Sequence, residues 1–243
     1  MISGQVKYYL LAALRVNLGA DTVLRMMLKR NFRHYEKAGA IFIHIPKCAG
    51  TSVSTSLYGH SLGHFRALDL FEYSQSKFLR LEKFAILRDP VERAYSAWSY
   101  ARNGGTTEGW IKPDVDFGDP EFRTFESFAE NWLPSRSIDE LDNVFRSQAS
   151  YVTDIEGGLL IDELVPLPML DVAWSRLVQN TLPTADRLLK LNRGGEGKTK
   201  KEWPQSVLDS LNHIYSEDAS LYQGSLKRYE SIICEDKKCY GAT

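Results

Sequence analysis

The sequence predicts an α/β fold in which helices flank a central parallel sheet. A short, β-branched apolar stretch, then a turn, then a helical pattern occurs at 40–58 and again at 84–101. Strand–turn–helix units in succession are typical of parallel sheets with crossover helices. The chain has 243 residues, of which 43% are apolar and 25% charged, so it is long enough for one domain with a sizeable core and short for two.

Residues 1–38 stand outside this pattern. Their apolar positions fit a helix better than a strand, so we expect a helical N-terminal segment packed on or beside a single domain at 39–243. The segment has seven Lys or Arg residues against two Asp or Glu residues. Two interpretations stay open: a helix packed on the domain, or a basic surface helix in peripheral contact with anionic lipid or an anionic acceptor.

The first expected strand, Ala40–Ile45, leads through a tight turn into a helix expected at Thr51–Tyr58. A buried strand that enters a helix through a glycine-containing turn is suited to bind an anion, because main-chain N–H groups and the helix dipole point outward there. Gly50 allows a close approach of the ligand, Lys47 adds a positive charge, and two hydroxyl side chains follow.

This turn is not a Walker A loop. In that pattern the lysine follows the last glycine, whereas Lys47 precedes Gly50 and the first glycine is missing. Nucleotide triphosphate hydrolysis therefore loses support. Taken alone, the turn is also consistent with a plain β–α connection that carries a surface lysine.

A second strand, expected at Phe84–Leu87, ends at Arg88. Asp89 is a plausible N-cap for the helix that follows to about 101, and Pro90 suits its first position. Because ligands of open α/β sheets bind outside the carboxyl ends of the strands, Arg88 and the hydroxyl of Ser96 should open on the same edge as the first turn. Arg93 is interpreted as a structural ion-pair partner.

Further along the chain the pattern predicts a functional loop, three more helices and two more strands. These are the loop Asn103–Pro120, the helices Glu121–Trp132, Pro168–Thr181 and Pro204–Tyr222, and the strands Leu159–Val165 and Arg187–Leu191.

Two stretches resemble a known family. HIPKCAGTS is similar to the 5′-phosphosulfate loop of the carbohydrate-type (family 2) sulfotransferases, and ILRDPVERAYSAWSY to their 3′-phosphate segment. Weaker likenesses extend to TFESFAENWL, FRSQASYV and YSEDASLY, so the resemblance covers roughly residues 41–222.

The resemblance implies a P-loop-like fold of three layers. It also implies that the chain transfers a sulfuryl group from 3′-phosphoadenosine 5′-phosphosulfate (PAPS) to a hydroxyl group, without a metal. The phosphosulfate would be held by Lys47, Cys48, Ala49, Gly50, Thr51 and Ser52, and the 3′-phosphate by Arg88 and Ser96. Cys48 stands where many relatives have threonine, and its thiol is expected to do little chemistry. A reactive thiol at the helix N-terminus is the alternative.

Sulfuryl transfer needs a base for the proton of the acceptor hydroxyl. LGHFRALDL resembles a stretch of the uronosyl 2-O-sulfotransferases in which the histidine is the catalytic base, and His64 matches that histidine. Its unperturbed pKa of about 6.5 suits the role. His60 and the loop carboxylates Glu108, Asp114 and Asp116 are the other candidates. With His64 as base and Lys47 as electrostatic stabiliser, direct in-line transfer follows.

The acceptor is less well specified. Glycan or glycolipid is the first choice through the resemblance, and a lipid or small-molecule alcohol is the second. A set of aromatic residues would either stack on sugar rings or belong to the core. This set is Trp98, Tyr100, Trp110, Phe117 and Trp132. The lysines of the Gly- and Lys-rich loop Arg193–Lys201 either close over the 3′-phosphate or meet an anionic acceptor, unless the loop is simply solvated.

Charge and composition narrow the function further. A net charge of −1 argues against a nucleic-acid partner. No stretch approaches the ~20 apolar residues of a membrane span, and three cysteines do not make a disulfide framework, although Cys234 and Cys239 could pair. We therefore expect a soluble, cytoplasmic enzyme. The rival functions are a P-loop nucleotide kinase or phosphotransferase and a non-catalytic nucleotide- or glycan-binding module.

Overall fold

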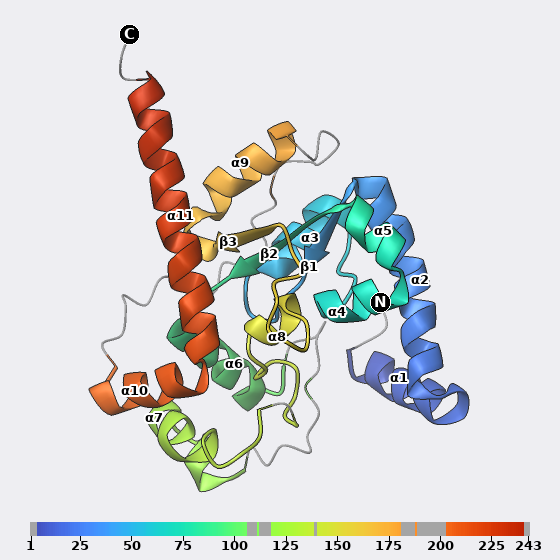
Figure 1. Ribbon diagram of the computed structural model, residues 1–243. Coiled ribbons are helices and arrows are strands. Elements are labelled where there is room, and N and C mark those ends of the chain that lie inside the picture. Colours follow the sequence, from blue (N-terminus) through green and yellow to red (C-terminus); the bar gives the residue numbers. More distant parts are fainter. Residues whose placement is uncertain are drawn as a thin grey trace.

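The computed structural model describes residues 4–105, 111, 118–138, 140–180, 188 and 203–240 (Figure 1). The α-helices are α1 (Gly4–Leu18), α2 (Ala20–Ala38), α3 (Gly50–Tyr58), α4 (Ala67–Tyr73), α5 (Gln75–Arg80), α6 (Pro90–Arg102), α7 (Phe125–Ser127), α8 (Ala149–Val152), α9 (Leu170–Asn180), α10 (Gln205–Ile214) and α11 (Ser216–Tyr240). The strands are β1 (Ala40–Ile43), β2 (Glu82–Leu87) and β3 (Glu163–Pro166). The described residues also form two 3₁₀ turns, Pro120–Phe122 and Leu167–Met169, and a π-helix, Phe128–Trp132.

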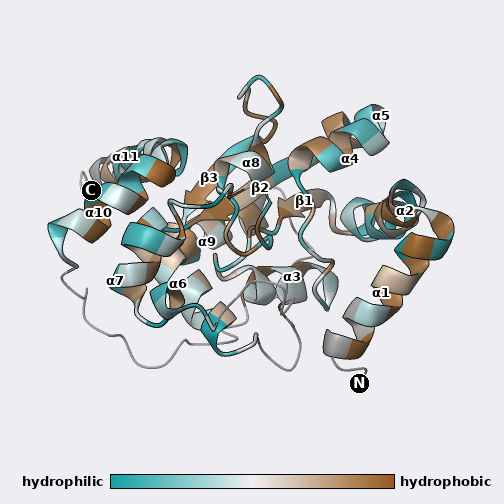
Figure 2. Ribbon diagram, turned by 90° about the horizontal axis from the view of Figure 1, so that it is seen from below, coloured by the Kyte–Doolittle hydropathy of each residue, from teal (hydrophilic) through white to brown (hydrophobic). Residues whose placement is uncertain are grey.

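Within these ranges the sheet has three parallel strands in the order β1-β2-β3. Phe42 of β1 pairs with Phe84 of β2, which pairs with Glu163 of β3, so all three carboxyl ends lie on one edge. Nearly every residue of β1 and β2 is buried, as expected for parallel strands covered on both faces. In Figure 2, α3 and α6 lie on one side of the sheet and α8 on the other. The prediction of an α/β fold on a parallel sheet is confirmed.

Two apolar clusters hold this arrangement together. The first surrounds the sheet and includes side chains of α2, α4, α8, α9 and α11. The second joins α6, α7, the π-helix and α10, and Phe122, Phe128, Trp132 and Phe145 interlock there with ring centroids 4.8–6.3 Å apart. Helix α6 therefore connects the sheet edge to a separate aromatic core.

The N-terminal segment forms two helices, as its spacing predicts. One face of α2 is buried, and its side chains Leu28, Phe32 and Tyr35 belong to the cluster around the sheet. The helix ends at Gly39, whose φ of 80° is the left-handed conformation that glycine tolerates best. Helix α1 packs against α2 at the edge of the molecule (Figures 1 and 2).

Two predicted helices are interrupted. The helix expected at 121–132 is a 3₁₀ turn, one helical turn and a π-helix, because Asp119 and Thr124 each cap a new start. The helix expected at 204–222 breaks at Tyr215, whose buried hydroxyl donates to the carbonyl of Phe145 over 2.7 Å. A new helix starts at once with Ser216, which is followed by the acidic residues Glu217 and Asp218.

The predicted strands also differ in extent. The first strand ends at Ile43 rather than Ile45, and the third occupies 163–166 rather than 159–165. The strand expected at Arg187–Leu191 lies outside the described residues, apart from residue 188. In the ranges that the structure describes, no helix is both long enough and apolar enough to cross a membrane.

Candidate functional site

The turn between β1 and α3 has an unusual main chain. Lys47 has a φ of 68° and Ala49 a φ of 58°, both in the left-handed region that non-glycine residues seldom adopt. Contacts from outside the turn hold it. The carbonyl of Pro46 accepts a hydrogen bond from Arg93 Nε over 3.2 Å, and the carbonyl of Lys47 accepts one from Arg88 Nη1 over 3.4 Å.

Gly50 starts helix α3 beneath a histidine ring. A Cβ atom at this position would lie 2.0 Å from His44 Cδ2, so only glycine fits against the ring. No described side chain caps this end of α3, and the first N–H groups of a helix, here those of Gly50 and Thr51, have no acceptor within it. The turn therefore presents main-chain donors where an anion would bind.

The Lys47 side chain folds onto α6. Its Nζ lies 4.2 Å from the ring centroid of Tyr100, a cation–π contact. Burial, together with the nearby charge of Arg88, lowers the pKa of Lys47 to about 8. The amine is therefore mostly protonated at neutral pH, and the cost of its desolvation would be offset by an anion.

Arg88 follows β2 directly and reaches the same turn. Its Nη1 contacts the Lys47 carbonyl, while its Nε lies 3.5 Å from the carboxylate of Glu92. Nε is buried and makes no hydrogen bond to any described residue. Because Nε is buried and faces Glu92, Arg88 could contact a second anionic group only through its Nη atoms, beside Lys47.

Ser96 is half-buried on α6, between the residues that contact these two cations. Glu92, Ser96 and Tyr100 follow at intervals of four residues and so share one face of α6. Glu92 contacts Arg88, and Tyr100 contacts Lys47. The structure thus brings the turn, Arg88 and Ser96 to one edge of the sheet.

His64 lies beside the turn and is oriented by the main chain. Its Nδ1 lies 2.7 Å from the carbonyl oxygen of His44, and the two rings are 4.2 Å apart. A carbonyl can only accept a hydrogen bond, so Nδ1 carries the proton and the neutral ring keeps its lone pair on Nε2. That nitrogen is the one that could act as a base.

The surroundings keep His64 neutral. The residue is exposed on one side, yet protein encloses the ring enough for desolvation to lower its pKa. The hydrogen bond to His44 and the charge of Asp142 oppose this shift, and the charge of Lys47 reinforces it. A neutral imidazole near Lys47 could accept a proton at Nε2, which is what a general base requires.

The other base candidates gain no such support. The ring of His60 packs edge-on against His34 of α2, with centroids 4.9 Å apart. Glu108, Asp114 and Asp116 lie outside the described residues. The loop Arg193–Lys201 lies outside them as well.

Cys48 is a packing residue. It is buried, its Sγ lies 3.3 Å from Gln148 Oε1, and burial raises the pKa of the thiol to about 11. Desolvation outweighs the nearby charges of Arg93 and Arg88, which lower the pKa, so burial argues against the alternative of a reactive thiol. Cys234 is a free, exposed cysteine, so its pairing with Cys239 is not observed.

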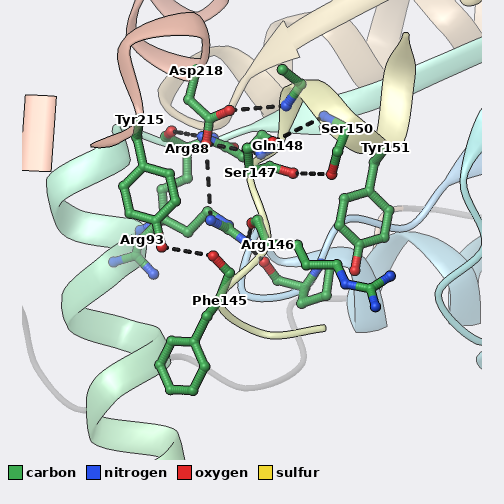
Figure 3. A network of polar contacts seen from close by, with 12 residues as sticks. Arg88, Arg93, Phe145, Arg146, Ser147, Gln148, Ser150, Tyr151, Tyr215 and Asp218 are labelled. Carbon is green, nitrogen blue, oxygen red and sulfur yellow. Dashed lines mark hydrogen bonds and ion pairs between the residues drawn. The ribbon is translucent and has the colours of Figure 1, made fainter. Parts of the chain in front are cut away.

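A buried polar network behind the turn was not predicted from the sequence (Figure 3). Gln148 accepts from the N–H of Arg88 and donates to its carbonyl, both over 2.9 Å. The N–H groups of Gln148 and Ala149 donate to the carboxylate of Asp218 over 2.8 and 2.9 Å. Gln148 and Asp218 lie in the weakly similar stretches FRSQASYV and YSEDASLY, which were the available signal.

Arg93 completes the network as a structural residue, which agrees with its interpretation from sequence. Its buried guanidinium donates to the carbonyls of Pro46, Val144 and Arg146, and lies 3.9 Å from Asp218. It therefore ties α6, the turn and the 144–146 segment to one another.

Most of the described aromatic candidates are core residues. Trp132 is fully buried, and Trp98 is buried with its Nε1 donating to the carbonyl of Phe122 over 2.9 Å. Tyr100 is half-buried under Lys47. Trp110 and Phe117 lie outside the described residues.

A cleft of about 450 Å³ opens next to the network. Ser147, Ser150, Tyr215 and Asp218 line it, together with Arg66, two residues beyond His64. None of the predicted site residues lines it. The predicted donor site is instead the edge formed by the turn and Arg88.

Comparisons with family models, with curated proteins and with solved structures found no match to this chain.

Proposed function

We propose that this chain is a PAPS-dependent sulfotransferase, with carbohydrate as the first choice of acceptor. The observation that carries the proposal is the contact between two cationic elements at neighbouring strand ends: Arg88 Nη1 lies 3.4 Å from the main chain of Lys47. A single donor with two anionic ends fits such a pair. The phosphosulfate would bind the Lys47 turn, and the 3′-phosphate would bind Arg88 and Ser96.

The turn would stabilise the charge that builds up during transfer. Its main-chain donors are held in a fixed, strained geometry, and Lys47 is partly desolvated. Donors fixed in advance need no reorganisation when the leaving phosphate forms, and such preorganisation supplies most of the rate enhancement in many enzymes. Thr51 and Ser52 add hydroxyl groups at the same helix end.

His64 would act as the base through Nε2. As the acceptor oxygen attacks sulfur, Nε2 takes the hydroxyl proton. The new S–O bond forms in line with the S–O bond to the 5′-phosphate, which breaks. The sulfated acceptor and 3′,5′-bisphosphoadenosine leave, and His64 returns its proton to solvent.

The finer fold description belongs to this proposal too. A P-loop-like fold of three layers would place the donor at the carboxyl edge of the parallel sheet, outside β1 and β2. Residues 39–243 would then act as one sulfotransferase domain. The likeness of HIPKCAGTS and ILRDPVERAYSAWSY to the two donor-binding segments of that family supports the assignment.

Ligand-induced shifts of the melting temperature test the donor class. Saturation at 100-fold above Kd stabilises a protein by about 2.7 kcal/mol, so 3′,5′-bisphosphoadenosine without metal should raise the melting temperature by several degrees. Lys47→Ala should lose most of the shift, while Lys227→Ala, an exposed control on α11, should keep it. A larger shift with ATP and magnesium would indicate a kinase instead.

Transfer of labelled sulfate from PAPS to a panel of glycans, glycolipids and small alcohols then tests catalysis. We expect a product with at least one acceptor and loss of turnover in Lys47→Ala. Donor binding with no transfer to any acceptor would indicate a binding module.

A further inference from the structure

Helix α2 presents a basic face to solvent, opposite the face buried in the core. Lys29, Arg30, Arg33 and Lys37 are all exposed; Lys29, Arg33 and Lys37 follow at intervals of four residues, and Arg30 precedes Arg33 by three. They therefore form one cationic stripe along the outer side of the helix.

This stripe is not neutralised by nearby acids. Within the described residues, no ion pair includes Lys29, Arg30, Arg33 or Lys37. The only acid on the C-terminal half of α2, Glu36, is already held by Lys77 and Arg80 of α5, at 3.1 and 2.9 Å. These two residues extend the positive surface from α2 onto α5.

The neighbouring helix α1 carries exposed apolar side chains. Leu10, Leu14 and Leu18 follow at intervals of four residues and are 55%, 38% and 48% exposed, and Val16 is 85% exposed. Helix α1 contains no Asp or Glu. Exposed leucines on one stripe, beside a cationic helix, are unusual on a surface that meets only water.

We propose that α1 and α2 dock on an anionic lipid bilayer surface, with the leucines of α1 in the headgroup region and the cationic stripe of α2 on the lipid phosphates. Residues 1–38 carry a net charge of +5, whereas the whole chain carries −1, so the charge of this segment favours contact with an anionic surface. A nucleic acid or an acidic polysaccharide would satisfy the cations but would bury no leucine. Both helices lie at one edge of the molecule (Figures 1 and 2).

Sedimentation with vesicles tests this docking. The full chain should bind vesicles of phosphatidylcholine with phosphatidylglycerol and should not bind phosphatidylcholine alone. Each basic side chain at such a surface contributes roughly fivefold in affinity, so Arg30→Gln with Arg33→Gln should bind about 25-fold more weakly. The matched control, Lys227→Gln with Arg228→Gln on α11, removes the same charge elsewhere and should bind like the unaltered chain.

The contribution of the leucines is tested separately. Leu10→Ser with Leu14→Ser keeps the charge and should weaken vesicle binding by at least roughly tenfold, while binding to soluble heparin or DNA stays unchanged. Equal binding to neutral vesicles, or no loss in Arg30→Gln with Arg33→Gln, overturns the proposal. The proposal is also overturned if Leu10→Ser with Leu14→Ser loses heparin or DNA binding but keeps vesicle binding. Stabilisation by 3′,5′-bisphosphoadenosine should be unaffected in each of these variants, which keeps this result separate from the donor assignment.

Discussion

Gly50→Ala is the change that most directly tests the geometry of the turn. The added Cβ would lie 2.0, 2.3 and 2.8 Å from Cδ2, Nε2 and Cγ of His44. Distances below 3.0 Å cannot persist, so the ring or the start of α3 has to move. The ring has little room, because it is 7% exposed and packs against Phe42 and His64 at 5.7 and 4.2 Å.

The expected cost is that of an overpacked core, about 1–3 kcal/mol. A domain with an unfolding free energy of about 5–15 kcal/mol stays folded after such a loss. The displaced histidine also supplies the carbonyl that orients His64. Turnover should therefore fall, in addition to the loss of stability, because the base is no longer aligned.

Urea unfolding of a double-mutant cycle separates the clash from other effects. His44→Ala removes the ring, so Gly50→Ala should cost much less in that background than in the unaltered chain. The control is Gly224→Ala on α11, where an added Cβ meets nothing within 4 Å and stability should rise by about 0.5–1 kcal/mol. If Gly50→Ala costs the same with and without the His44 ring, the contact is not the reason for the glycine.

Three further outcomes are expected. His64→Ala should lower kcat by about 10²–10⁴-fold while the affinity for 3′,5′-bisphosphoadenosine stays within about twofold; an unchanged kcat would exclude it as the base. Because the pKa of Lys47 is lowered to about 8, its positive charge is lost as the pH rises. The affinity for 3′,5′-bisphosphoadenosine, measured by calorimetry, should therefore fall about tenfold between pH 7 and pH 9. A similar decline in Lys47→Ala would assign the titration to another group. Iodoacetamide should modify exposed Cys234 but not buried Cys48 in the folded protein, as read by peptide mass spectrometry; rapid labelling of Cys48 would contradict its burial.

Local signals were sufficient for the elements that form the sheet edge. Asp89 was expected to cap α6, and its Oδ1 accepts from the N–H groups of Val91 and Glu92, both over 3.0 Å. The buried strands β1 and β2 could likewise be predicted from their short runs of apolar residues. The break at Tyr215 was not predictable, because a buried contact with the distant Phe145 accompanies it. The caps Asp119 and Thr124, which interrupt the helix expected at 121–132, are local signals that the sequence does contain.

The candidate site divides in the same way. Lys47 and Arg88 were identified because each stands at the end of a strand pattern. The role of His44 was missed, because in sequence it is only a polar residue at the end of an apolar run. Its importance comes from two tertiary contacts, one through its ring to Gly50 and one through its carbonyl to His64.

The network of Arg93 and Asp218 explains why so strained a turn persists. Two residues in the left-handed region cost of order 1–3 kcal/mol each, which the short helix α3 would not offset by itself. Arg93 donates to the carbonyl of Pro46, which directly precedes the turn. The side-chain oxygen of Gln148 accepts from the thiol of Cys48, within the turn, and from the main-chain N–H of Arg88. A buried ion pair such as that of Arg93 and Asp218 contributes little net stability compared with apolar packing. We therefore interpret its role as positional: the network keeps the Lys47 turn and Arg88 at a fixed separation before any ligand binds. A donor with two anionic ends would require that separation.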